Sequence, residues 1–289
     1  MGHPPLGAKR GILALILFVL RESTIMFILP PQAVGLLVLG LVAGVLSGMF
    51  GIGGGVVIVP ILTTFFGFAL QSAIGTSLGA LLMPVAILAV IEYYRAGKLK
   101  IAVAAPVAAG LVVGGWIGAQ IAFGLPVNTL RVLYGFFLLF ASWRFAEPRK
   151  WIAELRGGRL PAAPAEPSRG VSLWVLLALG FGAGIISGLF GVGGGIVIVP
   201  ALVGLLRFDQ KEAVATSLGA LLLPVGLPAV ITYYNNNAFD IATAVVVAVG
   251  LVFGAFGGAR ITLSLPSTTV KRLYGVFLLL VGLRFIFGG

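Results

Sequence analysis

Apolar residues fill long, nearly continuous stretches of this chain, and short polar connections separate them. Several stretches reach the roughly 20 residues that a helix needs to cross a bilayer. The strict alternation of apolar and polar residues that marks a strand of an outer-membrane barrel is missing. The pattern therefore predicts an all-α membrane protein. The expected continuous helices cover residues 72–94, 100–123 and 128–145 in the first half of the chain and 212–234, 240–263 and 268–285 in the second.

An internal duplication organises these helices. An offset of 140 residues, which carries Gly44 onto Gly184, aligns the two halves without a gap from Gly40 to Phe145. Roughly half of the aligned positions are identical, more than hydrophobic composition alone would give. The chain therefore divides into an N-terminal extension over residues 1–32, repeat 1 over 33–146, a linker over 147–170 and repeat 2 over 171–289.

The N-terminal extension carries one more apolar stretch. Lys9 and Arg10 precede a ten-residue apolar run, as in a signal peptide, but no small-residue cleavage site follows it. We therefore expect a non-cleaved extra helix over residues 11–29. A segment that lies in the membrane interface and an upstream extension before Met26 are the alternatives.

Each repeat opens with an apolar segment that glycines interrupt. Residues 47–55 read SGMFGIGGG, and residues 187–195 repeat them as SGLFGVGGG. Each glycine costs a helix about 1 kcal/mol relative to alanine, so the cluster predicts a break in the helix. The whole segment, residues 33–68, is too long for one span and too short for two spans joined by a turn. A re-entrant pair of half-helices fits this length, and one span with an unwound middle is the alternative.

Loop charges favour the re-entrant pair, because it leaves three crossings per repeat and so inverts the second copy. The loop 95–100 holds three basic residues, whereas its equivalent, 235–240, holds none. Conversely, the loop 67–72 is uncharged, whereas its equivalent, 207–212, holds two basic residues. Equivalent loops of the two repeats are thus expected to face opposite sides of the membrane.

We therefore expect two inverted repeats, each made of a glycine-broken, re-entrant helix pair and three transmembrane helices. The basic linker over residues 147–170 then lies in the cytoplasm together with both basic loops. Arg131 and Arg284 are exceptions, since this topology puts them on the outer side. A parallel arrangement would instead leave four basic residues outside, namely Arg207, Lys211, Lys271 and Arg272.

The composition narrows the function further. Of the 289 residues, 60% are hydrophobic and 9% are charged, and cysteine is absent. The net charge of +11 would suggest nucleic-acid binding in a soluble protein, but the basic residues here lie mostly between the spans, as cytoplasmic anchoring requires. The single histidine, His3, lies outside the repeats, so no thiolate or imidazole metal site is expected. The spans also lack paired acids and a Ser-His arrangement, so we expect no enzyme activity. Taken together, these features also lead us to expect no cofactor, no metal and no nucleic-acid partner.

The glycine breaks offer a way to bind an anion without a buried charge. The first N–H groups of a helix have no partner within it and carry roughly half a positive charge, and glycine lets an oxyanion approach the backbone. Hydroxyls beside the breaks and in the Ala-x-x-Thr-Ser helix that follows add neutral donors. Packing or hinge glycines, and hydroxyls bonded to helix carbonyls, are the alternative interpretation. We expect the breaks of the two repeats to face each other, with a substrate site formed by Ser47, Gly51, Gly53, Gly54, Gly55, Val56, Thr76, Ser77, Ser187, Gly191, Gly193, Gly194, Gly195, Ile196, Thr216 and Ser217.

The paired motifs SGMFGIGGGVVIVP and SGLFGVGGGIVIVP, each followed by an Ala-x-x-Thr-Ser helix, resemble those of the TauE/SafE family of sulfite exporters. The resemblance covers about residues 33–287. It implies a multi-pass permease of the plasma membrane for small anions such as sulfite or sulfonated organic acids.

On this basis we expect a secondary transporter that exports such anions by alternating access. An inside-negative potential, worth about 2.3 kcal/mol per charge per 100 mV, would itself drive anion efflux. A transporter or channel for another small solute is the alternative. The expected partners are a small anionic substrate and the lipid bilayer, and a homodimer is left open.

Overall fold

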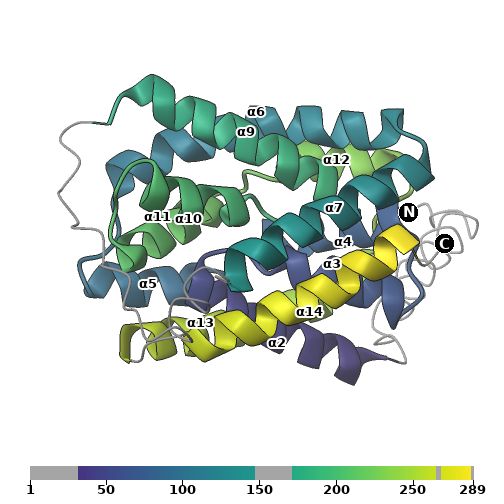
Figure 1. Ribbon diagram of the computed structural model, residues 1–289, viewed down its shortest axis with the longest axis horizontal. Helices are drawn as coiled ribbons and strands as arrows, with labels where there is room; N and C mark the ends of the chain where they lie inside the picture. Colours follow the sequence, from purple (N-terminus) through teal and green to yellow (C-terminus); the bar gives the residue numbers. More distant parts are fainter. Residues whose placement is uncertain (1–31, 147–170, 265–267, 288–289) are drawn as a thin grey trace, which may run out of the picture.

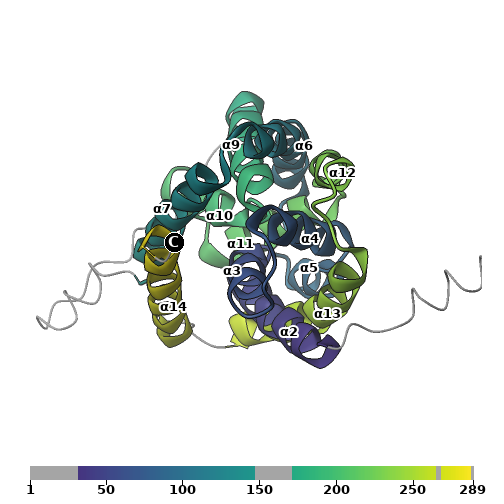
Figure 2. The same ribbon diagram turned by 90° about the vertical axis from the view of Figure 1, so that its right-hand side faces the viewer.

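The computed structural model describes residues 32–146, 171–264 and 268–287, and all regular structure in them is helical (Figures 1 and 2). Four of these helices are long and apolar enough to cross a membrane, and six spans result if each of two bent helix pairs counts as one. The protein is therefore an all-α, multi-pass membrane protein, as the apolar pattern predicts. The extra helix expected over residues 11–29 and the linker over 147–170 lie outside the described residues.

The two repeats contain equivalent sets of helices. Repeat 1 consists of α2 (Ala33–Phe50), α3 (Gly55–Thr64), α4 (Leu70–Leu82), α5 (Ile87–Arg95), α6 (Ile101–Gly124) and α7 (Val127–Ala146). Repeat 2 consists of α9 (Leu173–Phe190), α10 (Gly195–Gly204), α11 (Gln210–Leu222), α12 (Leu227–Asn235), α13 (Ile241–Ser264) and α14 (Thr268–Phe287). Each helix has the same length as its counterpart, so the duplication of the sequence is also a duplication of the structure.

The break expected at the glycines lies between α2 and α3 and, in repeat 2, between α9 and α10. Gly51 ends α2 in a left-handed conformation with φ 71°, and its N–H donates to the Ser47 carbonyl at 2.7 Å. Gly54, with φ 86°, precedes α3. A Cβ is strained at such φ values, so these positions require glycine for backbone geometry and not for low helix propensity alone.

A second break divides each helix that follows, and here the sequence-based prediction was wrong. Residues 72–94 were expected to form one helix, but α4 and α5 meet at an angle of 48°, and α11 and α12 meet at 52°. The cause is Pro84, whose ring excludes the helical conformation for the preceding residue. Met83 accordingly has φ −65° and ψ 152°, and Leu223, before Pro224, has φ −70° and ψ 151°.

Glycine ridges hold the long helices in close pairs. Helix α2 packs along α13, and α6 packs along α9, as Figure 1 shows. A Cβ at any ridge position would overlap the backbone of the neighbouring helix, so only glycine permits this approach. The ridge positions are Gly40, Gly44 and Gly48 in α2, Gly250, Gly254 and Gly258 in α13, Gly110, Gly114 and Gly118 in α6, and Gly180, Gly184 and Gly188 in α9.

Helices α7 and α14, which are equivalent in the two repeats, pack against each other and run antiparallel. The Ser142 hydroxyl, near the end of α7, donates to the carbonyl of Gly275, near the start of α14, at 2.7 Å. Gly135, in the first half of α7, lies against Gly282, in the second half of α14. Figure 2 shows this pair along one side of the helix bundle.

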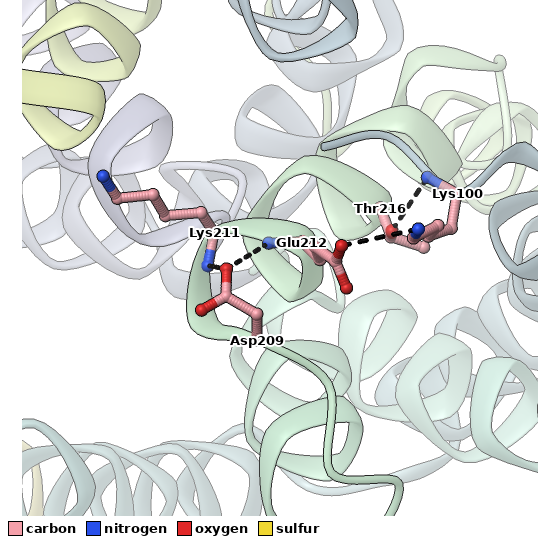
Figure 3. A network of polar contacts seen from close by, with 5 residues as sticks. All are labelled: Lys100, Asp209, Lys211, Glu212 and Thr216. Atoms are coloured by element: carbon pink, nitrogen blue, oxygen red, sulfur yellow. Dashed lines mark hydrogen bonds and ion pairs between the residues drawn. The ribbon is translucent and has the colours of Figure 1, made fainter. Parts of the chain in front are cut away.

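The two ends of the bundle differ in charge. At one end, which we call the basic end, the loops 95–100 and 207–212 meet: Lys100 forms an ion pair with Glu212 at 3.4 Å, and its backbone N–H donates to Thr216 Oγ1 (Figure 3). At the opposite end, the loop 235–240 packs on α4, and the backbone N–H of Asp240 donates to Thr76 Oγ1 at 3.1 Å. Equivalent loops of the two repeats thus lie at different ends.

Candidate functional site

The glycine breaks of the two repeats lie against each other in the centre of the protein. A Cβ on Gly53 would lie 3.4 Å from the Val192 carbonyl oxygen and 3.5 Å from Gly193 Cα. A Cβ on Gly55 would overlap the Gly191 carbonyl, and one on Gly195 would overlap the Gly51 carbonyl. Such reciprocal contacts are typical of an approximate two-fold relation between the two repeats.

A small cavity lies beside this contact. Its volume is about 30 Å³. Most of its lining residues form pairs related by the offset of 140 residues, so the cavity lies on the approximate two-fold axis. The lining residues are Ser47, Gly53, Leu78, Leu81, Leu82, Val85, Ala86, Ser187, Gly193, Leu218, Leu221, Val225 and Gly226.

Hydrogen-bond donors without a partner gather at this cavity. The hydroxyls of Ser47 and Ser187 have no hydrogen-bond partner among the described residues, and both side chains line the cavity. The N–H groups of residues 53–56, which precede and open α3, likewise have no acceptor in the described part of the chain, and Gly53 among them lines the cavity. These groups leave the site rich in donors, although no charged side chain lines it.

The carbonyl groups beside the break in repeat 1 do have partners. The Gly48 carbonyl accepts from the Tyr93 hydroxyl at 2.9 Å. The Met49 carbonyl accepts from Thr262 at 3.1 Å, and the Gly51 carbonyl accepts from the Ser217 hydroxyl at 2.8 Å. Side chains therefore satisfy the negative end of α2, while the positive end of α3 is left unpaired.

Repeat 2 reproduces most of these bonds. The Tyr233 hydroxyl donates to the Gly188 carbonyl at 3.0 Å, and the Ser77 hydroxyl donates to the Gly191 carbonyl at 2.8 Å. Because Ser77 and Ser217 each reach the break of the other repeat, these two bonds tie the halves of the protein together.

The expected site residues thus fall into groups. Ser47, Gly53, Ser187 and Gly193 line the cavity. Ser77 and Ser217 bond the opposite break, whereas Thr76 and Thr216 accept backbone N–H groups from the loops of the other repeat. The remaining expected residues lie buried in the contact between the breaks or in the helices that start there, and they are Gly51, Gly54, Gly55, Val56, Gly191, Gly194, Gly195 and Ile196.

The sequence analysis missed the apolar wall of the cavity and the two tyrosines. Leu78, Leu81 and Val85 lie in or just after α4, and their counterparts close the cavity from α11. The repeat carried a usable signal, because Tyr93 and Pro84 both recur 140 residues later. It could have marked the second break and the tyrosines, but not the carbonyls to which the tyrosines donate.

Metal coordination finds no support in the described residues, which contain no group of three or more histidine, cysteine or acidic side chains placed to hold an ion. The lining of the cavity itself offers neutral hydrogen-bond donors within an apolar wall.

Comparison with known proteins identifies the family of this chain. The sequence is 30% identical to YunE of Bacillus subtilis (strain 168), named a probable membrane transporter protein, over 88% of this chain and 97% of that protein. It is 28% identical to a probable membrane transporter protein of Methanocaldococcus jannaschii, over 85% of this chain and 94% of that one. No solved structure matches the chain. The family model described as Sulfite exporter TauE/SafE matches residues 36–285, and the chain therefore belongs to this family of membrane transporters.

Proposed function

We propose that this protein is a secondary transporter of the plasma membrane that exports small anions, with sulfite or organosulfonates as its substrates. The proposed site is the central cavity between the two glycine breaks. The family description names sulfite export, and the relatives are named membrane transporters. The choice of an anion rests on the hydrogen bonding at the cavity.

The observation that carries the proposal is the contrast between donors and acceptors at the breaks. The carbonyls of Gly48, Gly51 and Gly191 already accept bonds from side chains. The hydroxyls of Ser47 and Ser187 and the first N–H groups of α3 have no protein partner among the described residues. A site with free donors and occupied acceptors favours an anion over a cation. Neutral donors also suit transport, because they hold an anion less tightly than a fixed charge would.

We further propose that the repeats are inverted in the membrane and that α2–α3 and α9–α10 are re-entrant. The first turn of α2 supports this, because a Cβ on Gly35 would lie 3.2 Å from the Phe66 ring, which follows α3. The segment thus starts and ends at the same side of the bundle. The antiparallel contact of α7 with α14 and the separation of equivalent loops also favour inversion. The positive-inside rule makes the basic end cytoplasmic.

The elements that line the cavity support alternating access. Val85 and Ala86 line the cavity from the break between α4 and α5, and Val225 and Gly226 line it from the break between α11 and α12. Movement at these breaks would enlarge the cavity and open it to one side at a time.

Flux measurements on reconstituted protein test the proposal. Liposomes that contain the full chain and are loaded with sulfite should release it with saturable kinetics. Release should be faster when the interior is negative, since the potential contributes about 2.3 kcal/mol per charge per 100 mV. Sulfoacetate, thiosulfate, sulfate and the zwitterion taurine compete in parallel samples and rank the candidate substrates. Liposomes without protein give the background leak.

The proposal fails if no sulfur oxyanion or sulfonate shows saturable, protein-dependent flux. Saturable flux of a cation or a neutral metabolite in the same liposomes would assign the protein to another small solute.

A further inference from the structure

A second pocket, larger than the central cavity, lies at the end of the bundle opposite the basic end. Its volume is about 330 Å³, and it lies where α3 ends, α7 begins and α14 ends. Its polar lining comes from Thr63, Thr64, Asn128, Arg131 and Arg284. Asn128 and Arg284 are exposed and Arg131 is half-buried, so the pocket is open to solvent.

Two guanidinium groups give this pocket a positive charge. No acidic residue lines it, and neither arginine has an ion-pair partner within the described parts of the chain. The amino end of α7 adds roughly half a positive charge, and the carboxyl ends of α3 and α14 each subtract roughly half. The two full charges exceed these contributions, so the pocket keeps a positive excess that attracts anions.

The position of the arginines is unusual for this molecule. The other basic side chains that the structure describes gather at the basic end, in the loops 95–100 and 207–212 and on Arg260 beside Glu92. Arg131 and Arg284 thus oppose the charge asymmetry that orients the protein in its membrane. A single arginine can lie at a membrane interface without a ligand. Two arginines that line the same open pocket without an acidic partner favour the binding of an anion there.

We infer that this pocket binds a small oxyanion group through Arg131 and Arg284. A guanidinium presents paired N–H groups that match the oxygens of a sulfonate, sulfite or phosphate. The Thr64 hydroxyl and the Asn128 amide add neutral donors. Thr63 contributes shape alone, because its hydroxyl donates to the Val59 and Pro60 carbonyls of its own helix.

The pocket deepens the proposed function, on which this step rests, by giving the exported anion a site outside the central cavity. Helix α3 joins the two sites: it starts at Gly55, in the break, and ends at Thr64, in the pocket. Its 10 residues span about 15 Å. An anion that passes between the cavity and the water on the outer side would bind to the two arginines on its way, so their charge raises the affinity for the anion on this side.

An anionic lipid headgroup offers the same oxyanion chemistry, so the test must separate a soluble anion from a lipid. The variant is Arg131→Gln with Arg284→Gln, which removes two charges from the pocket. The matched control is Arg95→Gln with Lys98→Gln, which removes two charges from the basic end. Each full-length protein is reconstituted into phosphatidylcholine liposomes, with or without phosphatidylglycerol.

The pocket variant should raise the KM for sulfite flux by about tenfold, the loss expected for a charge-assisted hydrogen bond, while the maximal rate stays within about twofold. High salt should shrink the difference, because it screens exposed charges. The control should keep the wild-type KM. An effect that appears with phosphatidylglycerol alone would assign the pocket to a lipid headgroup instead of the exported anion.

Equilibrium binding of sulfite to the purified proteins separates this inference from the proposed function. Weaker binding by the pocket variant, in the absence of any flux by the wild type, would support the pocket and refute transport. Unchanged binding and an unchanged KM in the pocket variant, together with normal flux, would overturn the pocket and leave transport standing.

Discussion

Two kinds of buried serine lie beside each glycine break, and they differ in what their hydroxyls do. Ser77 and Ser217 donate to the break of the other repeat at 2.8 Å. Ser47 and Ser187 line the cavity and have no hydrogen-bond partner among the described residues. The first kind therefore contributes to the stability of the fold, and the second kind belongs to the proposed substrate site.

Replacing Ser77 and Ser217 with alanine should destabilise the protein. Each substitution leaves a buried carbonyl of Gly191 or Gly51 without its donor, which costs about 1–3 kcal/mol. Thermal unfolding of the purified protein, monitored in one detergent, measures the loss. The control is Ser47→Ala with Ser187→Ala, which breaks no bond to a described residue and should leave the melting temperature nearly unchanged. Equal melting temperatures for both variants would contradict this division.

The same control variant, Ser47→Ala with Ser187→Ala, should have a weaker affinity for the transported anion. If Ser47 and Ser187 donate to the anion, the two alanines remove one charge-assisted hydrogen bond each, and the KM for sulfite should rise by about tenfold per hydroxyl. Initial rates of flux over a range of sulfite concentrations give the KM. If the double variant keeps both the wild-type KM and the wild-type melting temperature, neither serine binds the substrate.

The positions of the glycine breaks could be predicted from the sequence, but the hydrogen-bond partners of the serine hydroxyls could not. A cluster of glycines in an apolar run predicts a break from helix propensity alone. The bond from Ser77 to Gly191 joins residues 114 positions apart in different repeats, so it depends on how the helices pack. No spacing along the chain distinguishes Ser77 from Ser47, although their surroundings differ completely.

At the scale of helices, the decisive feature is the second break, at Pro84 and Pro224. Hydrophobicity runs through this break without interruption, which is why a single helix was expected over residues 72–94. The conformational restriction that proline places on the preceding residue overrode the apolar pattern. Leu81 and Leu221, in the last turns of α4 and α11 before these bends, line the cavity.

Replacing Pro84 and Pro224 with alanine should slow transport without unfolding the protein. Alanine removes the restriction on Met83 and Leu223 and supplies the missing N–H, so α4 and α5 gain a tendency to join as one straight helix. We expect the maximal rate of sulfite flux to fall by about tenfold or more, with a melting temperature at or above that of the wild type. Flux and thermal unfolding of the same preparation measure both effects.

Pro106 provides the control for this prediction. It lies inside α6, which continues through it, so Pro106→Ala changes a proline where the helix has no break. This variant should transport at the wild-type rate. Wild-type rates for the variant at Pro84 and Pro224 as well would mean that the second breaks do not move during transport.

At the scale of the whole molecule, the loop charges and two contacts in the structure each support the proposed inverted topology. The charge pattern places the loops 95–100 and 207–212 on one side. The contact of Lys100 with Glu212 and the antiparallel packing of α7 on α14 are independent of that rule, because they follow from side-chain and backbone positions. The sequence missed the pocket at Arg131 and Arg284, where it treated both residues as exceptions to the charge rule. Their convergence depends on the antiparallel pairing of two helices that lie far apart in the chain.

The topology can be tested with single cysteines, since the natural chain has none. Ala96 and Asn236 are related by the offset of 140 residues, and both are exposed in loops at different ends of the bundle. In inverted repeats, a membrane-impermeant maleimide added to intact cells should label Asn236→Cys and leave Ala96→Cys unlabelled until the membrane is opened. Parallel repeats would place both cysteines on one side, so that both would react with the reagent under the same conditions. The comparison isolates orientation, because equivalent loops of a duplicated fold are expected to be similarly accessible to water and should differ chiefly in the side of the membrane that they face.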